Sequence, residues 1–71
     1  MTTGQKIRAA REAKGWSQAR LARAIGTDDS TISRYESDNR AVSLRRLSLI
    51  AKALGVAVHD LLGDEVEKRP A

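Results

Sequence analysis

The chain has 71 residues, enough for one domain, and carries a formal net charge of +4 with no cysteine and one histidine, His59. This composition excludes a disulfide framework, a thiolate nucleophile, a cysteine-ligated zinc site and a multi-histidine metal site. The first residues lack the apolar run of a secretory signal, and no stretch approaches the roughly 18 apolar residues of a membrane-spanning helix. We therefore expect a cytoplasmic protein with no metal, no cofactor, no membrane contact and no small-molecule ligand.

The positive charge is concentrated in one part of the chain. Residues 6–46 contain ten Lys or Arg against five Asp or Glu, whereas residues 64–71 contain two bases and three acids. A basic surface on the folded part fits polyanion binding. Residues 1–63 are predicted to form the domain, and residues 64–71 are predicted to be a solvated C-terminal tail.

Apolar residues at helical spacing, in runs that Gly15, Gly26, Gly55 and Gly63 punctuate, predict an all-α protein. In chain order, helices are expected at about residues 3–14, 17–25, 28–36, 43–54 and 57–62. Ser17 and Asp28 are expected to be N-caps of the second and third helices, and Gly26 opens the turn between them. The inward sides are expected to carry Ile7, Ala10, Leu21, Ala22, Ile25, Ile32, Tyr35, Leu44, Leu47, Ile50, Ala51 and Leu54.

Two short helices joined by the turn at residues 26–28 form a helix-turn-helix. With Ile32 and Tyr35 directed inward, the outer side of the third helix combines short polar residues with one long arginine, Arg34. A helix that is only solvated more often carries Glu and Lys pairs four residues apart. Short side chains admit base edges, so this pattern predicts a helix that enters a DNA groove.

Residues 15–22 (GWSQARLA) and 26–36 (GTDDSTISRYE) closely resemble the helix-turn-helix of the phage repressor/Cro (Xre) family. Residues 43–47, 50–56 and 60–62 are similar to the last two helices of that family, so the resemblance extends over about residues 4–63. It implies a five-helix, lambda repressor-like domain. It also implies a homodimeric transcriptional regulator, typically a repressor, that binds double-stranded DNA at an inverted-repeat operator.

The resemblance further implies roles for individual residues. The base-contacting positions are Gln18, Asp29, Ser30 and Arg34. Phosphate-contacting or secondary positions are Arg11, Ser17, Thr31, Ser33, Arg40 and Arg45. Arg11 is also expected to pair with Glu36, which would link the first helix to the end of the third.

Side-chain chemistry bears on some of these roles independently. The guanidinium fork of Arg34 matches guanine O6 and N7, a contact that discriminates by about 1–3 kcal/mol. Asp29 has two interpretations: it accepts from cytosine N4, or it is a first-turn acid that favours the helix dipole by about 0.3–1 kcal/mol. Trp16 is expected to cover the core between the first two helices. Arg20 and Arg23 are expected to lie in solvent.

The last predicted helix carries more apolar side chains than so short an element can bury. Val58, Leu61 and Leu62 are therefore expected to form a symmetric dimer contact, the alternative being packing over Ile7 and Leu54. Dimers of this kind place two recognition helices about 34 Å apart, one turn of DNA.

Other functions are weighed against DNA binding. No nucleophile, base and orienting group occur in a catalytic order, so an enzyme is not expected. A protein-interaction module or antitoxin-type partner protein with little DNA binding of its own, and an RNA-binding protein, are alternatives from other classes. The sequence leaves open whether a partner protein such as a toxin or an antirepressor exists. It also leaves open whether the chain belongs to a phage, toxin–antitoxin or restriction–modification system.

Overall fold

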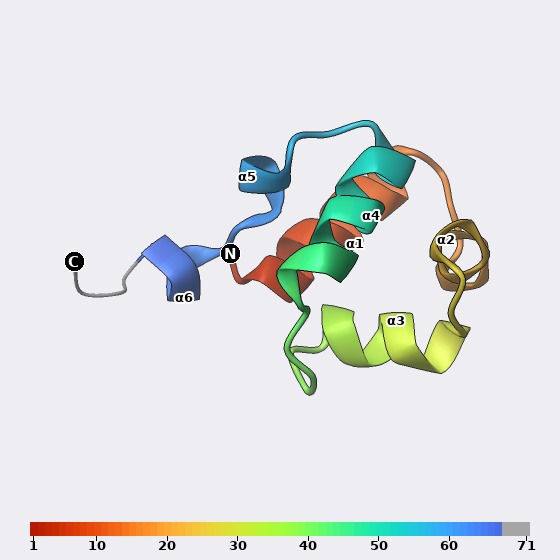
Figure 1. Cartoon of the computed structure of the whole chain (residues 1–71), viewed down its shortest axis with the longest axis horizontal. Coiled ribbons are helices and arrows are strands. Elements are labelled where there is room, and N and C mark those ends of the chain that lie inside the picture. Colours follow the sequence, from red (N-terminus) through yellow and green to blue (C-terminus); the bar gives the residue numbers. More distant parts are fainter. Residues whose placement is uncertain (68–71) are drawn as a thin grey trace.

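The computed structural model describes residues 1–67, with side chains described to residue 65. Its helices are α1 (Thr3–Ala13), α2 (Gln18–Ile25), α3 (Asp29–Glu36), α4 (Leu44–Leu54), α5 (Val58–Leu61) and α6 (Asp64–Glu67), and residues 1–67 contain no strand. Figure 1 shows α2 nearly end-on above one end of α3, while α5 and α6 lie at the other side near the start of the chain. The predicted all-α class and the five predicted helices are confirmed, with α6 as an additional single turn. None of the helices within these residues has the length and apolar character needed to cross a membrane.

Local capping chemistry sets the helix ends close to where the sequence placed them. Side-chain oxygens of Ser17, Asp28 and Ser43 each accept a hydrogen bond from the backbone N–H three residues later, at 2.8–3.2 Å. Such caps satisfy backbone donors that have no partner within the helix. Gly26 and Gly55 follow α2 and α4 with φ of 76° and 72°, a left-handed conformation that glycine adopts without steric strain.

One hydrophobic core connects α1 to α5. Its buried members are Ile7, Leu21, Ala22, Ile32, Tyr35, Leu47, Ile50, Ala51, Leu54 and Leu61, and Ala10, Trp16 and Ile25 pack against them partly buried. Ala22 is only 2% exposed, as its predicted inward position requires, and α2 packs against α3. Trp16 covers the edge of this core, as predicted. The core therefore contacts α3 on the inner side that carries Ile32 and Tyr35.

Two apolar residues lie where the sequence did not place them. Leu44 is 70% exposed, so its predicted inward position is wrong. It is the first residue of α4, and the buried stripe of that helix begins one turn later at Leu47. Leu61 is 1% exposed, so its predicted place in a dimer interface is also wrong. The single turn of α5 packs against α1 and α4, and Leu61 is the side chain that enters the core.

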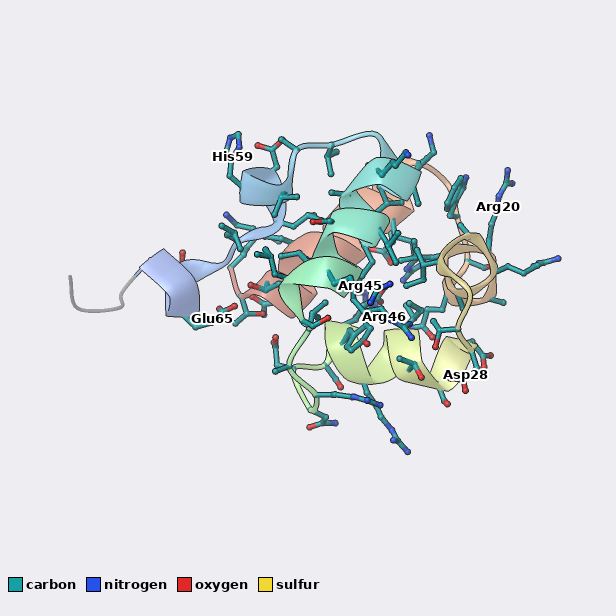
Figure 2. All side chains as sticks on the ribbon, viewed as in Figure 1. Arg20, Asp28, Arg45, Arg46, His59 and Glu65 are labelled. Carbon is teal, nitrogen blue, oxygen red and sulfur yellow. The ribbon has the colours of Figure 1, made fainter. Side chains whose placement is uncertain are left out.

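The segment after α5 is hydrogen-bonded to the start of α1, while its side chains at residues 64 and 65 stay exposed. The backbone N–H of Gly63 donates to Thr3 Oγ1 at 2.9 Å, and Glu65 Oε1 accepts from the Thr3 N–H at 2.8 Å. Figure 2 shows Glu65 directed back toward the first residues of the chain. The approach is close enough that a Cβ on Gly63 would overlap the backbone of Thr2 and Thr3. Residues 64–67 thus form the helical turn α6 at the start of the predicted tail, and residues 68–71 lie outside the described residues.

Candidate nucleic-acid interface

The outer face of α3 is polar and free of the protein interior. Ile32 and Tyr35 are buried on the inner side of the helix. The residues on the opposite side are all exposed: Asp29, Ser30, Ser33 and Arg34. Thr31, a secondary candidate, is half-buried between the two sides. The structure thus brings three of the four predicted base-contacting residues together on one accessible helix face.

Asp28 organises the N-terminal end of this face. Its Oδ1 accepts from the Thr31 hydroxyl at 2.7 Å, the Thr31 N–H at 2.8 Å and the Ser30 hydroxyl at 3.0 Å. These hydrogen bonds, the one from the Thr31 side chain first, hold the pKa of the Asp28 carboxyl below its ordinary value. Figure 2 shows Asp28 at the end of α3 next to α2.

This arrangement gives the neighbouring acids Asp28 and Asp29 different roles, and it orients Ser30. Capping by hydrogen bonds falls to Asp28, whereas the side chain of Asp29 is exposed in the first turn and has no hydrogen-bond partner among the described residues. The hydroxyl hydrogen of Ser30 is used toward Asp28. Ser30 therefore presents oxygen lone pairs outward, as an acceptor.

A buried ion pair connects α1 to the end of α3, as expected. Arg11 Nε and Nη2 donate to Glu36 Oε2 and Oε1 at 2.7 and 3.0 Å, and the two residues are 8% and 7% exposed. The third donor, Arg11 Nη1, binds the carbonyl oxygen of Trp16 at 2.7 Å. The hydrogen bond to Glu36 and its negative charge raise the pKa of Arg11, although burial opposes the shift. Because Arg11 is covered and its donors are engaged, this placement does not favour the phosphate contact expected of it.

Gln18 belongs to the same network. Its Nε2 donates to Glu36 Oε1 at 3.2 Å, so the carboxylate that binds Arg11 also orients the first side chain of α2. The half-buried Gln18 is thereby held beside the C-terminal end of α3. The sequence placed Gln18 among the base-contacting residues but did not predict this hydrogen bond, which joins residues 18 positions apart.

The remaining candidates lie around this centre. Ser17 is exposed, with its hydroxyl oxygen engaged as the cap of α2. Arg40, in the loop between α3 and α4, and Arg45, in the first turn of α4, are exposed. Arg46, which the sequence did not single out, is half-buried, and its Nη1 is covered without an acceptor among the described residues. The described residues contain no cluster of three His, Asp or Glu side chains suited to a metal.

An apolar groove of about 690 Å³ adjoins the loop that carries Arg40. Its apolar lining comes from the end of α3, the start of α4 and the end of α5, at Tyr35, Val42, Leu44, Leu47 and Leu62. The sequence did not predict this groove. Its one local indication was Leu44, an apolar residue directly after the N-cap Ser43 and one turn before the buried stripe of α4.

Comparisons with known proteins match most of the described fold. A family model described as helix-turn-helix matches residues 7–61. The chain belongs to this family, in its phage repressor/Cro (Xre) form. Among curated relatives, a hypothetical transcription factor of Neisseria meningitidis is 43% identical over 69% of this chain and 46% of its own length. The immunity repressor of Bacillus phage phi105 is 35% identical over 92% of this chain and 45% of its own length.

Solved helix-turn-helix structures superpose closely and confirm the lambda repressor-like fold. The P22 c2 repressor in complex with a synthetic operator matches with a TM-score of 0.82 and 29% identity, over 87% of this chain and 94% of that one. The restriction–modification controller C.AhdI of Aeromonas hydrophila matches with a TM-score of 0.81 and 38% identity, over 84% and 87% of the two chains. This chain spans about half the length of the curated relatives it matches first. An epoxidase of S. wedmorenis shares the fold alone, at 24% identity over 33% of its chain.

Proposed function

We propose that the protein is a transcriptional regulator that binds double-stranded DNA at an inverted repeat, acting as a repressor, with α3 in the major groove. The observation that carries the proposal is the exposed polar face of α3, which the core holds from behind. Family membership and relatives named as repressors support the same function. A helix supported in this way can enter the roughly 12 Å wide major groove without rearrangement of the domain.

Base contacts are assigned by the chemistry of each exposed group. Arg34, in the last turn of α3, offers the fork that matches guanine O6 and N7. Ser30, oriented by Asp28, accepts from an amino group of adenine or cytosine. Asp29 is exposed and has no hydrogen-bond partner within the part of the chain that the structure describes, which fits an acceptor for cytosine N4. Gln18 binds Glu36 through its amide nitrogen, so its amide oxygen can still accept a hydrogen bond. The residue lies beside the C-terminal end of α3.

Phosphate contacts fix the position of α3 but carry no sequence information. Arg40 and Arg45 are exposed and lie on consecutive segments after α3, which suits them to one DNA strand. Ser17 contributes through the N-terminus of α2, where backbone donors and the helix dipole favour an anion. Ser33 and Thr31 remain secondary candidates. Arg11 acts indirectly, by holding Glu36 and through it Gln18.

The apolar groove is proposed as the contact between two copies. Leu44 is the most exposed of the large apolar residues with described side chains, and Leu62, already a dimer candidate from the sequence, lines the same groove. Val58 is partly buried on the same short helix, α5, that leads to Leu62. Arg40 also lines the groove, so a second copy seated there would lie beside a phosphate-contacting loop. That position fits a dimer whose two α3 helices contact neighbouring half-sites.

We infer that this domain is not itself a catalyst and needs no cofactor, because its family model is a helix-turn-helix and the relatives it matches are named as regulators. The alternative is an interaction module or antitoxin-type partner that keeps the fold and binds protein in place of DNA. The two functions predict different behaviour with duplex DNA. A DNA-binding protein should lose affinity for the duplex as the salt concentration rises, because its phosphate contacts release counterions.

Selection of bound duplexes from a random pool tests the proposal. DNA binding predicts an enriched inverted repeat whose half-site centres are about one helical turn apart. Binding to that repeat should weaken steeply as the salt concentration rises. Failure to enrich any duplex, or equal binding to single strands, would favour the protein-binding or RNA-binding alternative.

A further inference from the structure

A second basic surface lies on α2 and on the turn before it. The Trp16 ring has Lys14 Nζ 5.3 Å and the Arg20 guanidinium carbon 4.7 Å from its centroid. A shallow hollow of about 470 Å³ is lined by Trp16, Arg20, Arg23 and Ala24. We call these residues together with Lys14 the α2 patch. No acidic side chain among the described residues forms an ion pair with its three cations.

The α2 patch faces away from the proposed DNA surface. Gln18 marks the side of α2 next to the end of α3, because it binds Glu36. An α-helix turns by about 100° per residue, so Arg20 projects about 200° from Gln18 around the axis of α2. Figure 2 shows Arg20 extending from α2 away from α3. A duplex in contact with the outer face of α3 therefore leaves the α2 patch open.

The chemistry of the patch favours a protein segment with carboxylates. Guanidinium groups bind carboxylates with two parallel hydrogen bonds, and Arg20 and Arg23 are exposed without such partners. Trp16 and Ala24 supply the apolar part of the lining of the hollow, which suits an aliphatic side chain beside the carboxylates. Trp and Arg are the residues that most often carry the binding energy of protein interfaces. The stacking of Arg20 on Trp16 also limits the side-chain freedom that binding would otherwise remove.

We propose that the α2 patch is a docking surface for an acidic segment of a partner protein, in which carboxylates flank an apolar residue. The segment binds while DNA occupies α3, because the two surfaces lie on different sides of the domain. Peptide binding to the α2 patch is tested independently of the DNA-binding proposal, and only simultaneous binding with a duplex rests on that proposal.

Trp16 is the only tryptophan, so its fluorescence reports directly on this surface. The probe is a short blocked peptide of glutamates with one central leucine, and its neutral counterpart has Gln at every Glu position. Binding is followed by Trp16 emission and, independently, by calorimetry. We expect saturable binding of the acidic peptide, much weaker binding of the neutral one, and no loss of peptide binding when the selected duplex is present.

The variant that tests the site is Arg20→Gln combined with Arg23→Gln. Its matched control, Arg8→Gln with Lys52→Gln, removes the same charge from exposed positions on α1 and α4. We expect the first variant to weaken peptide binding about fivefold or more, since exposed ion pairs contribute modestly but two are lost, and the control to change it little. Equal losses in both variants would reduce the effect to net charge and overturn the proposal. Displacement of the peptide by duplex DNA would also overturn it, by assigning the patch to nucleic acid.

Discussion

Arg11 and Glu36 meet in a two-point ion pair, Nε to Oε2 at 2.7 Å and Nη2 to Oε1 at 3.0 Å, with side chains only 10% and 3% exposed. The pair binds the last turn of α1 to the last residue of α3. Glu36 also receives the amide of Gln18, so one carboxylate positions the C-terminal end of α3 relative to both α1 and α2.

Replacement of Glu36 by Gln should lower the free energy of unfolding by about 3 kcal/mol, because it leaves the Arg11 charge buried without its counterion. Urea unfolding measures the change. The control is Glu12→Gln, which breaks the exposed Arg8–Glu12 pair at 3.5 Å and should cost at most about 1 kcal/mol. Similar losses in the two variants would contradict the role given to the buried pair.

The Asp28 cap makes stability depend on pH in the acid range. The folded-state pKa of Asp28 is lowered, so its contribution to stability is complete above the unfolded value of about 3.8 and is lost as the pH falls through the folded value. Asp28→Asn keeps a good N-cap but removes the titrating group. In urea unfolding at a series of pH values, the difference in free energy of unfolding between the wild type and Asp28→Asn should shrink as the pH falls below about 3.8. A constant difference between the two proteins would rule out this linkage.

Asp38 occupies a left-handed position that glycine usually fills, with φ of 62°. Its carboxylate accepts from the Gly4 N–H at 3.1 Å and the Thr2 hydroxyl at 2.6 Å, so it caps α1 from the loop after α3. Asp38→Gly relieves the backbone but removes both bonds, and we expect a net loss of about 1 kcal/mol in thermal unfolding. Asp38→Asn, which tolerates the conformation and keeps an oxygen, should lose less. A rise in Tm for Asp38→Gly would show that the cap contributes nothing.

Two leucines should respond differently to substitution: Leu44 is exposed on the proposed dimer face, whereas Leu61 is buried in the core. Leu44→Gln should weaken dimer formation measured by sedimentation while the monomer stays folded, because Leu44 is 70% exposed. Leu61→Ala should instead lower the free energy of unfolding by about 2–5 kcal/mol, as expected for a core residue. An unchanged dimer dissociation constant in Leu44→Gln would remove the groove from the interface.

Sequence reasoning was most successful where the physics is local. Ser17, Asp28 and Gly26 were placed correctly because capping and left-handed turns depend on residues within one helical turn. The polar face of α3 followed from helical periodicity once Ile32 and Tyr35 were assigned to the core. The Arg11–Glu36 pair, 25 residues apart, was expected from family resemblance and not from spacing.

The errors involve packing between distant segments. Leu61 was expected at a dimer face because periodicity in a one-turn helix cannot say which apolar residue enters the core. The helical turn at residues 64–67 depends on Glu65 reaching Thr3, a contact between residues 62 positions apart. The hydrogen bond that the Gly4 N–H donates to Asp38 likewise joins a helix end to a loop 34 positions later. Such contacts form only in the folded chain, so local sequence patterns do not reveal them.

The most direct test of DNA recognition by α3 is the binding preference of wild type and Arg34→Ala for every single-base change in the selected repeat. The account predicts that Arg34→Ala loses about 1–3 kcal/mol of discrimination for guanine at one position in each half-site and keeps the preferences elsewhere. Identical preferences in the two proteins, or no preference in the wild type, would contradict it.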